Sequence, residues 1–243
     1  MLSRTRNDPG LRILRNCSLV CKAWVSRASL YLFREFSCVR EQEIFHALTV
    51  IRQSKRVQQS IVCLTIALRG IPLIEYCHAI ISCSRLQQLN ILQAHPVYSL
   101  HKREVWPRNT EKTLEHFHMS SMLKDTSLVT FIQIIALFGT VKHATIIQPS
   151  HDQRGDAARI SSVVGLTVSD YQSTALPVVA DWFMPCSLSN LCLDVQKGES
   201  PAIQAPLVDE ALRMMGGSII HLSYKHSRFY EPLLESEHIQ VAG

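Results

Sequence analysis

The chain lacks the short motifs that usually signal catalysis. It has only nine glycines in 243 residues, and none of them forms a phosphate-binding loop of either common type. The patterns His-Glu-x-x-His and Gly-x-Ser-x-Gly are missing. Ser121–Lys124 matches Ser-x-x-Lys, but the Ser-Asp-Asn and Lys-Thr-Gly elements that accompany it in penicillin-recognising enzymes are not present. The sequence therefore predicts no catalytic residue and no cofactor, and we expect a protein that is not an enzyme.

Long hydrophobic runs are also missing. The longest, at 131–141, is interrupted by Gln133 and Gly139 and falls short of the roughly 18 residues that a membrane-spanning helix needs. The first ten residues contain no apolar core, so we expect no signal peptide. None of the eight cysteines forms Cys-x-x-Cys. Reduced thiols in a cytoplasmic or nuclear protein are therefore expected, with no metal site and no membrane partner.

Charge is modest and positive. The net charge is +5 and the pI is near 8.8. Basic residues gather between positions 4 and 34 and around His101–Arg103. Nucleic-acid binding needs basic clusters with stacking aromatics, and these clusters favour a solvated surface instead.

An amphipathic helical pattern begins near the start of the chain. Asp8 and Pro9 suit the cap and first position of a helix. From there apolar residues recur every three or four positions and form one stripe, namely Ile13, Cys17, Val20, Trp24 and Ala28. A helical segment this short needs a partner to dock on, and a cap over the following core would serve as well as another protein.

Within this segment, Cys17-Ser-Leu-Val-Cys-Lys-Ala-Trp24 resembles the second half of an F-box of the fungal type. The resemblance implies a helical module at residues 1–40 that binds the Skp-type adaptor of an SCF ubiquitin ligase. The residues expected to contact the adaptor are Leu14, Cys17, Leu19, Val20 and Trp24. The family normally has a further Leu-Pro-containing helix before this point. Only Met1–Gly10 precede the segment here, so a truncated F-box is expected.

A second pattern is repeated behind it. The template apolar-x-x-apolar-x-apolar recurs at intervals of 22 to 31 residues, which predicts seven short strands. The matches are Ile61-Leu64-Ile66, Leu86-Leu89-Ile91, Leu114-Phe117-Met119, Val141-Ala144-Ile146, Val163-Leu166-Val168, Leu188-Leu191-Leu193 and Ile219-Leu222-Tyr224.

Helix-like stretches lie between most of the matches. We predict helices at 71–81, 126–138, 176–184 and 208–215, the second ending at Gly139, and a polar loop at 95–112. The alternation resembles a degenerate leucine-rich-repeat solenoid of about seven strand–helix units over residues 58–226. Residues 227–243 are then a tail or a capping helix. The alternative is a doubly wound α/β domain, which would have longer, more continuously apolar strands.

Strand side chains alternate between two faces, so the template also predicts the concave face that a substrate would meet. Its residues are Thr65, Gln88, Asn90, His116, His118, His143, Thr145, Thr167, Asn190, His221 and Ser223. Three imidazoles gather there, but no fourth zinc ligand is evident, and polar surface residues are the expectation.

These features predict a non-catalytic protein-interaction module, the substrate receptor of an SCF-type cullin–RING ligase, with an unknown protein as its substrate. A repeat scaffold without a ubiquitin role, or a truncated and non-functional F-box product, is the alternative. An unrecognised enzyme would instead need a pocket of titratable residues with perturbed pKa values.

Overall fold

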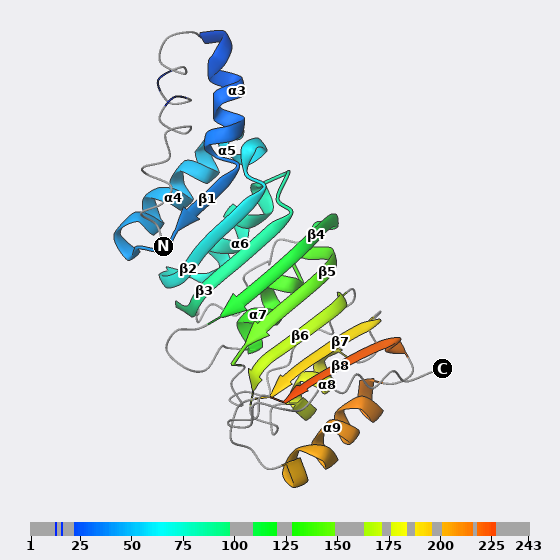
Figure 1. Cartoon of the computed structure of the whole chain (residues 1–243). Helices are drawn as coiled ribbons and strands as arrows, with labels where there is room; N and C mark the ends of the chain where they lie inside the picture. Colours follow the sequence, from blue (N-terminus) through cyan, green and yellow to red (C-terminus); the bar gives the residue numbers. More distant parts are fainter. Residues whose placement is uncertain are drawn as a thin grey trace. The chain divides into compact units, whose positions relative to one another are not determined.

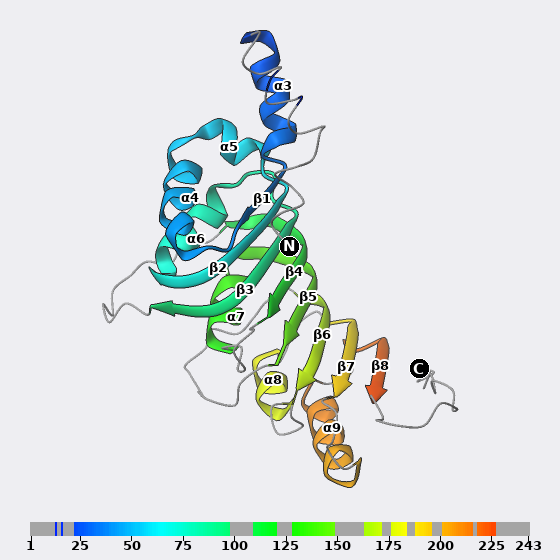
Figure 2. The ribbon, with the colours of Figure 1, turned by 60° about the vertical axis from the view of Figure 1, so that its left-hand side comes forward.

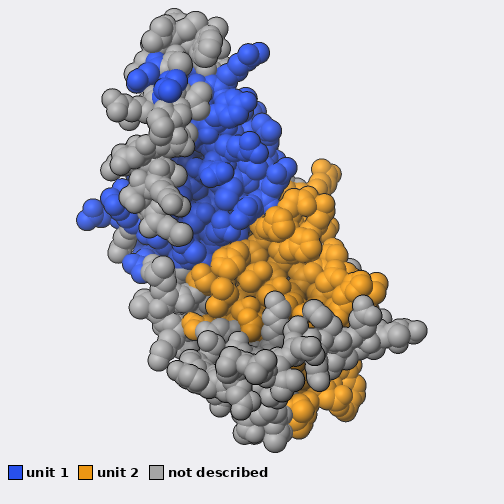
Figure 3. Space-filling model, viewed as in Figure 1, with its two compact units in different colours: residues 1–92, 96–107 blue, residues 93–95, 108–243 orange. Residues whose placement is uncertain are grey.

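The computed structural model describes residues 13, 16, 22–97, 109–120, 128–148, 163–171, 176–183, 188–195, 201–215 and 218–226. The chain forms two compact units (Figure 3). Unit 1 comprises Met1–Leu92 and Pro96–Pro107, and unit 2 comprises Gln93–His95 and Arg108–Gly243. Both units contain strands and helices, and every strand pair with a described register is parallel. The α/β class predicted from the sequence is confirmed.

Unit 1 is rich in helices (Figure 1). Its strands follow chain order in the sheet, β1-β2-β3. In the parallel pair β1–β2, Glu35 lies opposite Cys63 and Cys38 opposite Ile66. The elements, in order, are α3 (Lys22–Leu32), β1 (Glu35–Cys38), α4 (Glu41–Gln53), α5 (Lys55–Ser60), β2 (Cys63–Pro72), α6 (Leu73–Ser82) and β3 (Gln88–Val97).

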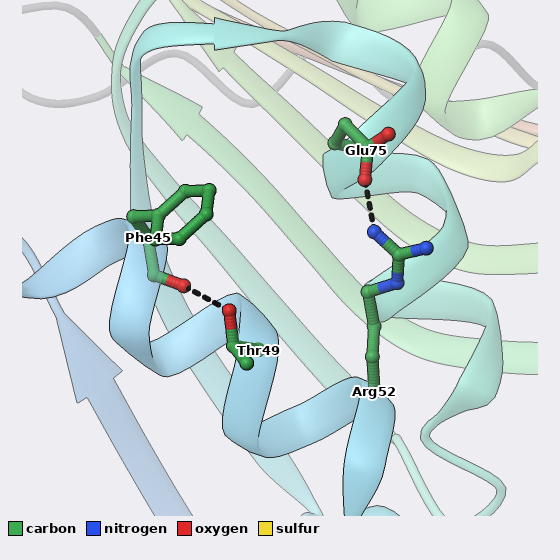
Figure 4. Close-up of polar contacts among 4 residues, drawn as sticks. All are labelled: Phe45, Thr49, Arg52 and Glu75. Carbon is green, nitrogen blue, oxygen red and sulfur yellow. Dashed lines mark hydrogen bonds and ion pairs between the residues drawn. The ribbon is translucent and has the colours of Figure 1, made fainter.

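Helices α4 and α6 both contact β2, and one ion pair joins the two helices. The guanidinium of Arg52 on α4 meets the carboxylate of Glu75 on α6, as Figure 4 shows. Deeper in the unit, the hydroxyl of the fully buried Tyr76 donates to the Arg69 carbonyl at 2.8 Å and accepts from the Arg69 N–H at 2.9 Å. Gly70 follows with a φ of 61°, a conformation that favours glycine. Tyr76 thus satisfies both backbone groups at the point where β2 turns into α6.

Unit 2 is dominated by strands (Figures 1 and 2). Five parallel strands again follow chain order, β4-β5-β6-β7-β8. The elements, in order, are β4 (Asn109–Ser120), α7 (Leu128–Ile135), β5 (Phe138–Ile147), β6 (Val163–Tyr171), α8 (Leu176–Phe183), β7 (Asn190–Val195), α9 (Pro201–Met215) and β8 (His221–His226).

The apolar template residues form the core of both units. In the first six matches all three residues are buried, whereas Ile219, Leu222 and Tyr224 are only half-buried. In unit 2 the Phe117 ring on β4 stacks on the Phe131 ring on α7, with 5.2 Å between the ring centroids. This contact places α7 on the template side of the sheet, and Figure 1 shows α7 behind β4 and β5. The opposite side of these strands carries the polar residues.

One hydrogen-bond arrangement recurs where strands begin. In each case the backbone carbonyl of the residue directly after the first apolar residue of a template match accepts two consecutive backbone N–H groups from the next match. Arg34 accepts from Val62 and Cys63, Val62 from Gln87 and Gln88, and Ser189 from Ile220 and His221, all at 2.8–3.0 Å. The Val164 carbonyl accepts from the Ser189 N–H and also from the Ser189 hydroxyl. Successive strands therefore start in the same way in both units.

Strand order separates the two predicted architectures. A doubly wound domain reverses its strand order at a switch point. Among the described strands, neither unit contains such a reversal, because β1–β3 and β4–β8 each follow chain order. The doubly wound alternative is therefore not supported within either unit.

The sequence-based boundaries need corrections. Gly139 does not end a helix, because α7 stops at Ile135 and Gly139 is the second residue of β5. Helix α9 begins at Pro201, seven residues before the predicted start. The loop predicted at 95–112 is partly strand, since β3 runs to Val97 and β4 begins at Asn109.

Some elements were not predicted at all. Helices α4 and α5 lie between residue 40 and the first predicted strand, and strand β1 lies within residues 1–40, which were expected to be helical. That expectation is wrong at Glu35–Cys38, because these residues pair with β2 as a parallel strand. The template does occur there, at Phe33-Phe36-Cys38, with Cys38 buried and the rings of Phe33 and Phe36 in contact at 6.5 Å. An eighth match was therefore present in the sequence.

Part of the predicted adaptor-binding set lies outside the described residues, namely Leu14, Cys17, Leu19 and Val20. Trp24 falls in α3, and its side chain is also outside the description. The tail or capping helix expected at 227–243 lies outside it as well. None of the described helices combines the length and apolar character needed to cross a membrane.

Candidate functional site

The outer face of unit 2 is the side of β4–β8 opposite the buried template residues. The sequence placed eight of its candidate residues here, namely His116, His118, His143, Thr145, Thr167, Asn190, His221 and Ser223. Three of the histidines, at positions 116, 143 and 221, are exposed, and the other residues are half-buried. The alternation of the strands explains this placement, since each residue lies next to a template residue in sequence.

Strand register aligns these side chains in two rows across five strands. The first row, which we call the histidine row, runs through His116, His143, Gly165, Asn190 and His221. The second row, the hydroxyl row, runs through His118, Thr145, Thr167, Cys192 and Ser223. Neighbouring strands in a sheet lie about 4.8 Å apart, so each row presents polar groups at that interval.

The first two imidazoles of the histidine row are stacked. The ring centroids of His116 and His143 lie 5.3 Å apart and the ring planes differ by 17°. One residue earlier on each of these two strands, Lys142 Nζ lies 2.9 Å from Glu115 Oε2.

Gly165 explains how the stacked pair fits on the sheet. A Cβ atom at this position would lie 3.1 Å from His143 Nδ1 and 3.2 Å from the Lys142 carbonyl oxygen. Both contacts are tighter than those of most real Cβ atoms. Glycine at position 165 thus leaves room for the His143 ring to lie over β6, and the ring in turn helps to bury Gly165.

The hydroxyl row is less exposed and differs in its electrostatics. His118 is half-buried, and loss of water around it lowers the pKa of its imidazole. The neutral form of His118 is therefore favoured near physiological pH. Asp194 on β7, half-buried and two positions beyond Cys192, contributes a carboxylate at the end of the same face.

Unit 1 has its own outer face, formed by Thr65, Gln88 and Asn90 from the predicted set together with Cys63. The Asn90 amide donates to Thr65 Oγ1 at 3.1 Å and to Cys63 Sγ at 3.6 Å. Gln88 Nε2 in turn donates to Asn90 Oδ1 at 3.2 Å. These side chains bind one another, so much of their hydrogen-bonding capacity is used within the unit.

Three of the described thiols of unit 1, those of Cys38, Cys63 and Cys77, have raised pKa values. Burial raises the pKa of Cys38 to about 11, with a further contribution from Glu43. Burial also raises the pKa of Cys77 to about 12. At Cys63 burial and then Glu35 raise the pKa, against hydrogen bonds from Thr65 and Asn90. A nucleophilic cysteine needs a lowered pKa, so these positions argue against thiol catalysis.

Metal-ligand clusters were searched over the same described ranges. No group there brings together three or more His, Cys, Asp or Glu side chains in reach of one ion. His116 and His143 adjoin, but His118 lies in the other row and His221 lies three strands beyond His143. Of the three histidines that the sequence analysis placed together, His116 and His143 are therefore adjacent, and His118 lies in the other row.

Two contributors were missed by the sequence reasoning. Gly165 gave no signal, because a lone glycine in a strand pattern has many explanations. Cys63 was passed over because the template highlighted only Thr65 on that strand, although Cys63 is also two residues away on the same face.

Comparison of the chain with family models, with curated proteins and with solved structures found no match.

Proposed function

We propose that this protein is a non-catalytic protein-interaction module that binds its partner with the outer face of unit 2. The observation that carries the proposal is the pair of polar rows in register across β4–β8. A broad sheet surface with evenly spaced hydrogen-bonding groups suits the recognition of another protein chain, as the concave faces of repeat proteins do.

We further propose that the two units are built from leucine-rich-repeat-like units. The buried template triplets support this, as does the recurring carbonyl that accepts two N–H groups at 25- to 31-residue intervals. Leucine-rich repeats have one short strand and one helix or turn in 20–29 residues. Parallel strands in chain order fit such an array.

The proposed role is that of a substrate receptor for an SCF-type ubiquitin ligase. The support is the F-box-like sequence at Cys17–Trp24 and the helix α3, Lys22–Leu32, that contains its end. The adaptor would bind Leu14, Cys17, Leu19, Val20 and Trp24, and the outer face would hold the substrate. The ligase's other subunits would supply the chemistry.

The adaptor step is tested by binding of the purified full chain to Skp-type adaptor. We expect Trp24→Asp to abolish binding, because a carboxylate would replace the largest apolar contact of the stripe. The matched control is Tyr31→Asp, which changes an aromatic residue of the same helix that is 60% exposed and outside the adaptor set. Equal binding by the parent chain and Trp24→Asp would contradict the receptor role.

The alternative is a scaffold with the same binding face and no ubiquitin role. Under this alternative the adaptor does not bind the parent chain, while partners crosslinked in cells still map to the outer face. Crosslinks lost in a Thr145→Arg, Thr167→Arg double variant but kept in a Thr49→Arg control would support the face without the adaptor.

A further inference from the structure

We infer that His116 and His143 form a two-histidine capture site for a late divalent transition metal ion, with its remaining coordination positions open. The inference is independent of the proposed ligase role. It rests on the register of two strands, on the stacked rings and on the glycine beneath them.

Strand geometry brings the two donors together. His116 and His143 are register partners on adjacent parallel strands, and both side chains are exposed on the outer face. Their backbones are fixed by the sheet, so little ordering is needed before a metal ion binds. Imidazole nitrogen is a favoured ligand of Ni²⁺, Cu²⁺ and Zn²⁺.

The ring separation is close to what one ion requires. Metal–imidazole bonds of about 2.0–2.1 Å hold two nitrogens about 3.3 Å apart around a tetrahedral ion. The ring centroids are 5.3 Å apart and the planes are tilted by 17°. Because a metal ion lies in the plane of each imidazole that binds it, the two nearly parallel rings must turn toward each other about their side-chain bonds, while the strands stay in place.

Gly165 fixes the orientation of the second ring. Because a Cβ atom there would lie 3.1 Å from His143 Nδ1, any other residue at this position would require the ring to shift from its place over β6. The more distant Nε2 edge is then left for a ligand. Gly165 is thus a positioning residue for the site.

The surroundings limit the donor set to two. Glu115 is engaged by Lys142 at 2.9 Å, and no third His, Cys, Asp or Glu in the described chain completes a cluster. Structural zinc sites use four protein ligands, so this pair does not make one. Water, or a donor from a bound partner, would fill the open positions.

The test is calorimetric titration of Ni²⁺ into the full chain without a polyhistidine tag. Ni²⁺ is the probe because Cu²⁺ oxidises thiols and the outer face carries Cys192. We expect His116→Gln and His143→Gln each to weaken the main binding event at least about tenfold, since each removes the chelate. His221→Gln and Cys192→Ser are matched controls on the same face and should leave the affinity unchanged.

Gly165→Ala provides a variant that keeps both imidazoles. We expect it to weaken Ni²⁺ binding as well, because the new methyl group displaces the His143 ring. Circular dichroism of each variant checks that the fold is kept. Unchanged affinity in His116→Gln or His143→Gln, or an equal loss in His221→Gln or Cys192→Ser, would overturn the site. Unchanged affinity in Gly165→Ala would overturn the positioning role of the glycine.

Discussion

Unit 1 and unit 2 both bury the apolar residues of the template, but they differ in where their titratable side chains lie. Unit 1 buries the thiols of Cys38, Cys77 and Cys83 in its core, beneath its helices. Unit 2 carries imidazoles on its outer face, where His116 and His143 are exposed and stacked on each other. The buried template residues form the core in both units, while the proposed binding residues lie on one face of unit 2.

The outer faces differ in a second way. In unit 1 the side chains of Thr65, Gln88 and Asn90 are hydrogen-bonded to one another. In unit 2 the corresponding positions hold two stacked rings, whose nitrogens stacking does not use. A face whose donors and acceptors bind one another has less to offer a partner. This difference supports the proposal that the partner binds to unit 2.

The largest effect should come from the core of unit 2. Phe117 is 1% exposed and stacks on Phe131, so Phe117→Ala should lower the free energy of unfolding by about 3–5 kcal/mol. Urea unfolding measures the loss, and hydrogen exchange should show weaker protection in β4 and β5. The outer-face control Thr167→Ala should change stability by no more than about 0.5 kcal/mol. Similar losses in both variants would mean that the two faces are not distinct.

The second largest effect is expected at high pH and comes from a buried thiol of unit 1. Burial raises the pKa of Cys77 to about 12, above the ordinary thiol value near 9. Below pH 9 the thiol is protonated in both the folded and unfolded states. Between pH 9 and 12 only the unfolded state loses the proton, so stability falls as pH rises, by on the order of 1.4 kcal/mol per pH unit.

Cys77→Ala should therefore make the alkaline loss of stability shallower. Urea unfolding between pH 8 and 10.5 measures the slope. The control is Ile80→Val on the same helix, which removes one buried methylene and should lower stability at every pH without changing the slope. Identical slopes in Cys77→Ala and the parent chain would show that the buried thiol does not couple to folding.

The smallest effect on stability is expected at low pH and comes from a histidine of unit 2. Desolvation lowers the pKa of His118 in the folded state below its ordinary value near 6.5. Above pH 6.5 the ring is neutral in both states, and below it the unfolded state takes up the proton first. Stability is therefore lost as pH falls through 6.5. His118→Gln should make this acid slope shallower in urea unfolding from pH 7.5 to 5, whereas the exposed-site control His221→Gln should not. A slope in His118→Gln as steep as in the parent would refute the assignment.

The sequence predicted where β2–β8 lie because burial and periodicity act locally, but strands β2–β6 have 9–12 residues and are longer than the short strands expected. All three template residues are buried at six of the seven positions, from Ile61 to Leu193. Helices α6 and α8 begin within two residues of their predicted starts, since each is bounded by a proline or follows a strand directly. These features depend on nearest neighbours in the chain, which a sequence displays.

What the sequence did not predict depends on contacts between strands. The His116–His143 stack needs the register of β4 on β5, and template spacing alone does not fix that register. The role of Gly165 requires knowing which ring lies above it. Gly139 misled the prediction because glycine after an apolar run is a common helix end, yet here the next strand had already begun at Phe138.

The carbonyls of Arg34, Val62 and Ser189 have a consequence for how such a chain can change length. Each joins two strand beginnings through the backbone alone, and the segments they span are 28, 25 and 31 residues long, from Arg34 to Val62, Val62 to Gln87 and Ser189 to Ile220. These hydrogen bonds depend neither on the side chains nor on the length of the segment between the two strand beginnings. Duplication, loss or enlargement of one strand with the segment that follows it would thus leave these backbone hydrogen bonds available to the neighbouring strands. The chain would then change length by whole strand-containing segments, while each remaining strand begins with the same hydrogen bonds.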